Sequence, residues 1–411
     1  MKYYSLHLFF VFIISTLLVN FSYSNDYVSQ LRAKAEQGDT KAQYFLGFNY
    51  EKGISFEKDI EEAIKWYKLA ADQGNADAQF RIGLIYINGT AVKQNAVEAA
   101  KWFRLAAELG LHEAQFNLAV MCENGMGVKE DKAEALKWYR KAAEQNYANA
   151  QFNLGVMYQK GVGVVKNELE AINWFKLAAD QGLPEAQNSL GHIYSKNAVD
   201  NEDLLEAVRW FKMAADQNNA DSQYFLGSMY ARGTGVRADF VEAAKWFRLS
   251  AEQGLHDAQY NLGYMYEGGF GVTKDITTAI VYYKQAAKQG NAQAQRSLGH
   301  IYINGMGDRS NASEAFKWFK QAADQGDVNA QYNIGVLYFQ GNGVPQNKNE
   351  ALKWYRLAAD QGYPYAQYNI GLMFLKGNGV PQDKVEAAKW FKLAENHGLP
   401  GIPSAIDALN K

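Results

Sequence analysis

The chain has 411 residues, of which 48% are hydrophobic and 14% aromatic, and its formal net charge is −2. Its 42 Lys and Arg are balanced by 44 Asp and Glu without a conspicuous basic block or stripe, which argues against a nucleic-acid binder and against a polybasic membrane-surface segment. A single cysteine, Cys122, excludes an intramolecular disulfide and a cysteine-rich zinc site.

Residues 1–24 have the pattern of a secretory signal peptide. Lys2 is the only formal charge in this segment, and an apolar run over residues 6–19 is followed by the small residues Ser22 and Ser24. The run is shorter than the roughly 20 residues that a membrane-spanning helix needs. We therefore expect cleavage after Ser24 and a secreted or periplasmic mature chain without a membrane span. The alternative is an uncleaved N-terminal anchor.

The rest of the chain repeats with a period of 36 residues and no insertion. Three residue types recur in phase. Glutamine occurs as Gln43, Gln79, Gln115, Gln151, Gln187, Gln223, Gln259, Gln295, Gln331 and Gln367. Tryptophan occurs as Trp66, Trp102, Trp138, Trp174, Trp210, Trp246, Trp318, Trp354 and Trp390, with Tyr282 in the remaining slot, and an alanine column runs from Ala63 to Ala387. A period of this size predicts a solenoid, a propeller or an array.

One unit, residues 148–183, indicates how each repeat folds. The apolar residues of its first half share one helical face: Ala150, Leu154, Met157 and Tyr158. Those of its second half, within residues 167–181, also share one: Ala171, Trp174, Phe175, Ala178 and Ala179. Gly161 and Gly163 interrupt the first helix, and Gly182 ends the second at a position that needs positive φ, a role that Asn146 and Asn218 take in two other repeats. The sequence thus predicts an all-α solenoid of ten helix–turn–helix repeats over residues 40–399.

Close packing explains two of the recurrent residue types. Gly155 and its counterparts, with Ala119 in the third repeat, lie in mid-helix, where glycine costs up to about 1 kcal/mol relative to alanine. We expect the second helix of the same repeat to cross there. Trp174 and its equivalents should fill the gap between repeats, each with one N–H to satisfy.

The repeat resembles the Sel-1-like repeat family, a relative of the tetratricopeptide repeats. The residues that carry the likeness in one unit are Ala150, Leu154-Gly155, Tyr158, Gly161-Val162-Gly163-Val164, Glu170-Ala171, Trp174, Ala178-Ala179 and Gln181-Gly182. The resemblance covers about residues 40–399 and implies a right-handed superhelix that acts as an adaptor in protein complexes. It also implies, for secreted bacterial members, roles in host interaction and envelope processes.

Some repeats depart from the common pattern. Repeat five lacks the turn glycines, repeat seven has Thr278 for Glu and Tyr282 for Trp, and repeat eight has Asp308-Arg309 where others have Val. These changes should alter stacking locally. We expect residues 25–39 and 400–411 to be half-repeats that cap the two ends of the array.

The variable positions of the first helix are the first candidate for a binding face. We number positions 1 to 36 from residue 40. Position 6 holds asparagine in five repeats: Asn117, Asn153, Asn261, Asn333 and Asn369. An asparagine amide donates and accepts at once, so a ladder of them could hold an extended peptide. The alternative is that these residues are solvated or cap a neighbouring helix.

Position 5 is aromatic in eight repeats and could form an exposed contact stripe or part of the core. Its exceptions are Asn188 in repeat five and Arg296 in repeat eight. The same two repeats carry His192 and His300 at position 9, where the others are mostly apolar or aromatic. We therefore expect a specialised patch at His192, Arg296 and His300.

Enzyme signatures are weak. Ser55 and Lys58 have the Ser-x-x-Lys spacing of penicillin-recognising enzymes but lie in an expected turn without that family's other motifs. The histidines do not have the spacing of metal ligands, and His112 and His256 occupy the same position of two repeats, which we expect to be on the surface. The Gly-x-Gly motifs recur as turns between helices rather than as phosphate-binding loops. Cys122 replaces a tyrosine of the core face and is expected to be an inert buried thiol; the alternative is a reactive one.

These observations favour a non-catalytic scaffold whose concave groove binds a protein or peptide partner, in the periplasm or outside the cell. We expect a monomer without a cofactor. The alternative is an envelope enzyme, or an enzyme's cofactor, acting on peptidoglycan or β-lactams. A secreted factor that engages a eukaryotic host would need the same scaffold, because fold alone does not fix function.

Overall fold

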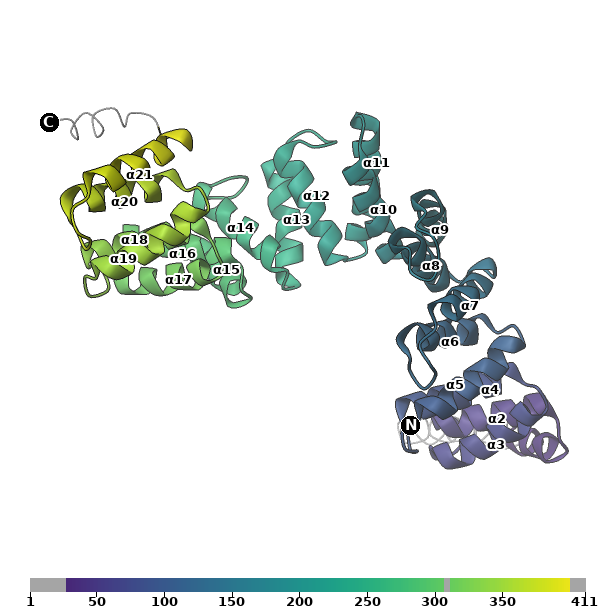
Figure 1. Ribbon diagram of the computed structural model, residues 1–411. Helices are drawn as coiled ribbons and strands as arrows, with labels where there is room; N and C mark the ends of the chain where they lie inside the picture. The colour runs from purple at the N-terminus through teal and green to yellow at the C-terminus, as the bar shows by residue number, and fades with distance from the viewer. Residues whose placement is uncertain (1–26, 307–310, 400–411) are drawn as a thin grey trace, which may run out of the picture. The chain divides into compact units, whose positions relative to one another are not determined.

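The structure is a computed structural model that describes residues 27–306 and 311–399 (Figure 1). The predicted signal peptide, the predicted C-terminal cap over residues 400–411 and the Asp308-Arg309 departure lie outside the described residues. Every regular element in the described part of the chain is a helix. A helix over residues 27–36 comes first, and its Leu31 and Ala35 are buried against Leu46 of repeat one.

Ten helix pairs follow, one for each repeat (Figure 1). The first helices, called helix A below, are α2 (Thr40–Lys52), α4 (Ala76–Asn88), α6 (His112–Asn124), α8 (Ala148–Lys160), α10 (Pro184–Asn197), α12 (Ala220–Arg232), α14 (His256–Gly268), α16 (Ala292–Asn304), α18 (Val328–Gln340) and α20 (Pro364–Lys376). The second helices, called helix B, are α3 (Ile60–Asp72), α5 (Ala96–Glu108), α7 (Lys132–Glu144), α9 (Glu168–Asp180), α11 (Asn201–Asp216), α13 (Phe240–Glu252), α15 (Ile276–Lys288), α17 (Ala312–Asp324), α19 (Lys348–Asp360) and α21 (Lys384–Asn396).

Capping residues fix where these helices start and stop. In repeat four, Asn167 precedes α9 and its side chain accepts a hydrogen bond from the backbone N–H of Glu170. Gly161 ends α8 with φ of 72°, and Gly182 follows α9 with φ of 91°. Asn146 and Asn218 adopt φ of 64° and 66°, so the prediction that they replace this glycine is confirmed.

The chain divides into two compact units, Met1–Leu190 and Gly191–Lys411, with the boundary inside α10. In each unit, successive helices pack against one another in chain order. The predicted fold class, an α-solenoid of ten helix–turn–helix repeats, is confirmed.

The mid-helix glycines lie where helix B of the same repeat crosses helix A. An aromatic ring of helix B packs directly against each of these glycines. A Cβ added to Gly155 would come within 2.7 Å of the Phe175 ring, and one added to Gly335 within 2.5 Å of the Tyr355 ring. Both rings are buried. The expected close crossing is therefore confirmed, and the ring that occupies the space is at position 28.

The recurrent glutamine of position 4 joins successive repeats through its buried amide. In repeat four, Nε2 of Gln151 donates to the carbonyl oxygen of Ala143 at 3.2 Å, and Oε1 of Gln151 accepts from Nε2 of Gln181 at 2.7 Å. The same two bonds recur along the chain and satisfy buried polar groups that would otherwise destabilise each junction. The role of this column is thus structural.

The tryptophans of position 27 pack between repeats, as predicted. Trp102 lies on a cluster formed by helix B of repeat one and helix A of repeat two. The N–H of Trp66 donates to Glu62 at 3.1 Å. Four other indole nitrogens are buried and have no hydrogen-bond partner among the described residues: those of Trp174, Trp210, Trp246 and Trp318.

Repeats five and seven show what their departures change. Without its turn glycines, repeat five has a longer helix A of 14 residues and a helix B of 16 residues, which begins at Asn201 behind the capping residue Asp200. Helix B is 13 residues long in repeat four. In repeat seven, Tyr282 takes the tryptophan position and stacks on Tyr266, with ring centroids 5.9 Å apart.

Candidate functional site

Three grooves lie at equivalent places between the helix-A segments of successive repeats. We call them groove 1/2, groove 6/7 and groove 9/10 after the repeats that form them, and they measure about 360, 230 and 380 Å³. Each is lined by positions 12 and 13 of one repeat and by positions 6, 9 and 10 of the next. The position-6 residues in the three grooves are Arg81, Asn261 and Asn369. The variable positions of helix A predicted as a binding face therefore line these three grooves.

Groove 9/10 combines an apolar floor with a few polar groups. Val336, Phe339, Leu372 and Met373 supply the apolar part of the lining. Nδ2 of Asn369 lies 3.4 Å from the Tyr332 hydroxyl. Burial raises the pKa of Tyr355, whose ring lies 5.8 Å from that of Tyr332. Lys376 is the only charged residue among the described ones that line this groove.

Groove 1/2 is polar and contains a partly buried charge network centred on Glu51. Oε2 of Glu51 accepts from the Tyr67 hydroxyl at 2.7 Å, and Oε1 lies 2.8 Å from Nζ of Lys52 and 3.6 Å from Arg81. Burial raises the pKa of the Glu51 carboxyl, but the hydrogen bonds from Lys52 and Tyr67 and the charge of Arg81 outweigh it and hold the pKa below its usual value. Lys58 also lines the groove, so the side chains of three cations lie around one ionised carboxylate.

Groove 6/7 is lined mainly by aromatic and apolar side chains. Its rings are Phe240, Phe247, Tyr264 and Phe270, and within residues 27–306 and 311–399 Arg232 is the only charged residue of its lining. Asn261, predicted from the asparagine pattern, lines it as well.

The remaining position-6 asparagines are bonded within the described part of the chain, two of them within their own helix and Asn153 to the preceding repeat. Nδ2 of Asn117 donates to the carbonyl oxygen of Glu113 at 2.7 Å, and Nδ2 of Asn333 donates to that of Asn329 at 2.9 Å. Asn153 pairs with the hydroxyl of Tyr139. All three side chains are half-buried on helix A.

The aromatic residues of position 5 are half-buried rather than fully exposed or fully buried. Each packs on the position-28 ring of its own repeat: Phe152 lies 5.6 Å from Phe175, and Tyr260 lies 5.7 Å from Tyr283. They form the edge of the core beside the grooves, with part of each ring accessible.

The two predicted histidines lie against aromatic rings of helix B. His192 meets Phe211 edge-on at 5.1 Å, and His300 meets Phe319 in the same way at 5.0 Å. Burial lowers the pKa of both imidazoles, and for His300 the charge of Arg296 lowers it further. Arg296 itself forms a 2.7 Å ion pair with Asp327. The structure thus brings Arg296 and His300 together in α16.

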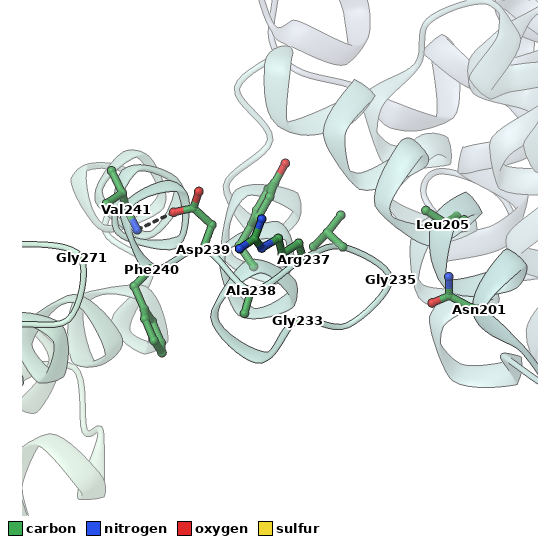
Figure 2. A pocket seen from close by; sticks show the side chains of 12 residues that line it. Asn201, Leu205, Gly233, Gly235, Arg237, Ala238, Asp239, Phe240, Val241 and Gly271 are labelled. Carbon is green, nitrogen blue, oxygen red and sulfur yellow. Dashed lines mark hydrogen bonds between the residues drawn. The ribbon is translucent and has the colours of Figure 1, made fainter.

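A larger concavity of about 1110 Å³ lies at the edge of repeats five to seven, where helix A turns into helix B. Figure 2 shows Asn201 and Leu205 of α11 on one side and the turn with Gly233, Gly235 and Arg237 on the other. Phe240 and Val241, at the start of α13, also line it.

The structure also shows the surroundings of the serine and the cysteine that the sequence singled out. Ser55 is exposed in the turn before α3, which begins only at Ile60, so Ser55 and Lys58 are not set on one helix. Cys122 is fully buried, and this burial raises the pKa of its thiol to about 11. Among residues 27–306 and 311–399, no three His, Cys, Asp or Glu side chains gather as metal ligands. None of the described helices has both the length and the apolar character of a membrane span.

Sequence reasoning missed the exposed aromatic residues of repeats six and seven. Phe240 is the only phenylalanine at position 21 in the ten repeats, and Phe270 is the only one at position 15. A comparison of the repeats outside the helix-A positions would have found both.

Comparisons with known proteins agree with this architecture. The Sel1 repeat family matches ten consecutive segments, 40–75, 76–111, 112–147, 148–183, 184–219, 220–255, 256–291, 292–327, 328–363 and 364–399. No curated protein matches the sequence.

Two solved structures are similar over most of the chain. One is c5321, described as a protective antigen present in uropathogenic Escherichia coli strains and displaying an SLR fold; it is 34% identical, with a TM-score of 0.68, over 93% of this chain and 90% of that one. The other is a Sel1 repeat protein from Oxalobacter formigenes, 33% identical with a TM-score of 0.59 over 75% of this chain and 90% of that one. Proteins of this kind are generally non-catalytic scaffolds for protein interactions. The chain belongs to the family of Sel1-repeat proteins.

Proposed function

We propose that the chain is a non-catalytic scaffold that binds a protein or peptide partner along helix A, in the periplasm or outside the cell. The observation that carries this proposal is the recurrence of a groove at the same place in three repeat junctions, each containing a position-6 residue. A periodic surface of this kind suits an extended polypeptide, whose own backbone groups and side chains recur at short intervals.

The composition of the grooves supports a polypeptide ligand. Apolar floors such as Val336 and Leu372 offer burial for side chains, while the amide of Asn369 and the ammonium of Lys376 offer hydrogen bonds and charge. The bonds made by Asn117 and Asn333 to their own helix are short-range and can be exchanged for bonds to a ligand at small net cost.

The location outside the cytoplasm rests on residues 1–24 alone. Their single charge, apolar run and Ser22-Tyr23-Ser24 ending are the features that signal peptidases recognise. Intact-mass measurement of the protein recovered from periplasm and medium tests this part. A mature chain that begins near Asn25 supports it, and a full-length chain held in the membrane fraction contradicts it.

The binding proposal is tested by capture from the organism's own envelope and secreted fractions. Asn261→Ala combined with Asn369→Ala removes one amide from each of two grooves, and Asn153→Ala combined with Asn333→Ala removes two more. Asn173→Ala, an exposed asparagine of α9 on helix B, is the matched control. We expect the groove variants to lose captured partner and the control to retain it. Equal capture by all variants would contradict a role for the helix-A amides.

The absence of catalysis is part of the proposal and has its own test. Purified protein incubated with nitrocefin and with peptidoglycan should release no product above a boiled control. Hydrolysis that disappears in a Ser55→Ala variant would instead support the envelope-enzyme alternative.

A further inference from the structure

We propose that the exposed rings of Phe240, Phe270 and Tyr264 form an anchoring site for an acidic polypeptide segment that carries a large apolar side chain. This inference rests on the proposed function and adds a place and a ligand chemistry to it. We call these three residues the aromatic trio.

The trio is one continuous apolar surface. The ring centroids of Phe240 and Phe270 are 5.6 Å apart, and those of Phe270 and Tyr264 are 5.5 Å apart in a stacked arrangement. The three residues nevertheless keep 46%, 38% and 50% of their surface exposed. Val241 extends the surface and is 64% exposed.

The repeat does not need these rings to fold. The residues equivalent to Phe240 include Ala96, Lys132, Glu168 and Lys348, and those equivalent to Phe270 include small and polar ones such as Thr90 and Asn342. Their helices and turns have the same bounds as those of repeats six and seven. Exposed aromatic side chains that the scaffold does not require indicate an interaction site, because aromatic residues carry much of the binding energy at interfaces.

Two hollows flank the trio and share Phe240. On one side lies groove 6/7, and on the other lies the concavity of about 1110 Å³. One wall of that concavity includes Asn201, which belongs to the extra turn that repeat five gains by losing its turn glycines (Figure 2). A bound segment could therefore place one large side chain on the rings and continue into a hollow in both directions.

The charges that line the two hollows favour an acidic occupant. Groove 6/7 contains Arg232, and the concavity contains Arg237; both are exposed, and neither forms an ion pair within the described residues. Among the described residues that line the two hollows, the only carboxylate is Asp239, which accepts hydrogen bonds from the backbone N–H groups of Val241 and Glu242 at 2.9 and 3.1 Å (Figure 2). Two free guanidinium groups thus flank the rings, a complementary arrangement for carboxylates on both sides of an apolar anchor.

The test is selection from a phage-displayed library of random peptides on the full mature chain. We expect enrichment of peptides with an aromatic or large aliphatic residue flanked by Asp or Glu. A synthetic copy of an enriched peptide should bind Phe240→Ser with Phe270→Ser at least ~10-fold more weakly than the unmodified chain, measured by fluorescence anisotropy. Arg232→Gln with Arg237→Gln should weaken binding and reduce its dependence on salt.

Leu357→Ser with Leu393→Ser is the matched control, since it removes two exposed leucines from helix B in repeats nine and ten. This control should bind as the unmodified chain does, and circular dichroism should show all variants folded. Enrichment of basic peptides, or binding unaffected by the two phenylalanines, would overturn the proposal. So would sedimentation showing that the trio joins two copies of the chain. A native partner that needs Asn261 and Asn369 but not the trio would overturn it while leaving the proposed function intact.

Discussion

Oε1 of Gln79 is buried without a hydrogen-bond donor because Leu109 occupies the position from which a glutamine donates in seven other repeats. Repeat two therefore carries a defect in the bonding that joins the other repeats. Leu109 is 56% exposed, so it buries little apolar surface at this position.

Restoring the donor should stabilise repeat two. Leu109→Gln supplies an amide at the same place as Gln73 or Gln145, so we expect the free energy of unfolding to rise by about 1 kcal/mol. Urea denaturation followed by circular dichroism measures the change. Leu105→Gln, an exposed leucine one turn earlier on α5, should leave stability almost unchanged. Equal effects of the two changes would show that polarity, rather than the bond to Gln79, is responsible.

A methyl group at Gly155 should destabilise repeat four. The gain in helix propensity from Gly155→Ala is about 0.5–1 kcal/mol, while overpacking against the Phe175 ring at 2.7 Å costs about 1–3 kcal/mol. We expect a net loss of about 1–2 kcal/mol in urea denaturation. Repeat three has Ala119 at the equivalent position, in the same buried cluster as Tyr139. The packing around this position can therefore accommodate a methyl group when the rest of the repeat is matched to it. A Gly155→Ala protein that is more stable than the original would contradict the close-crossing account.

The Glu51 network should make stability depend on pH in the acid range. The folded pKa of Glu51 lies below its usual value of 4.5, so the unfolded chain binds the proton more readily. The stabilisation is therefore present above about pH 4.5 and is lost as the pH falls through the lower folded pKa. Glu51→Gln should unfold at lower urea at neutral pH and lose less stability between neutral and acid pH. Parallel pH profiles for the two proteins would contradict this assignment.

Cys122 should be unreactive in the folded chain. Burial raises the pKa of its thiol to about 11, so almost no thiolate forms near neutral pH and the sulfur is inaccessible. Iodoacetamide should label the protein only after unfolding in urea, as measured by intact mass. Full labelling of the native chain would favour the reactive alternative.

The fold was predictable because its determinants recur. Gln151, Trp174 and Gly155 each belong to a column whose period is visible without any structure, and the packing of Trp174 and Gly155 followed from residue size and spacing. The partners of these residues were not predictable in the same way. The bond from Gln181 to Gln151 spans 30 positions, and only the packed repeats show that the two amides meet.

The site was predictable only in part. The position-6 pattern led to Asn261 and Asn369, which do line grooves, while Asn117 and Asn333 turned out to bond their own helix. Phe240 and Phe270 escaped notice because they lie on helix ends and turns, where variation between repeats looks like ordinary surface change.

Site-specific photocrosslinking in the native organism tests the central claim, that partners bind along helix A, most directly. A benzophenone amino acid in place of Val336 or Leu372 reports on groove 9/10, and one in place of Leu357 or Leu393 reports on the helix-B surface of the same repeats. The account predicts adducts with a polypeptide from the groove positions and none from helix B. Adducts only from Leu357 or Leu393 would contradict it.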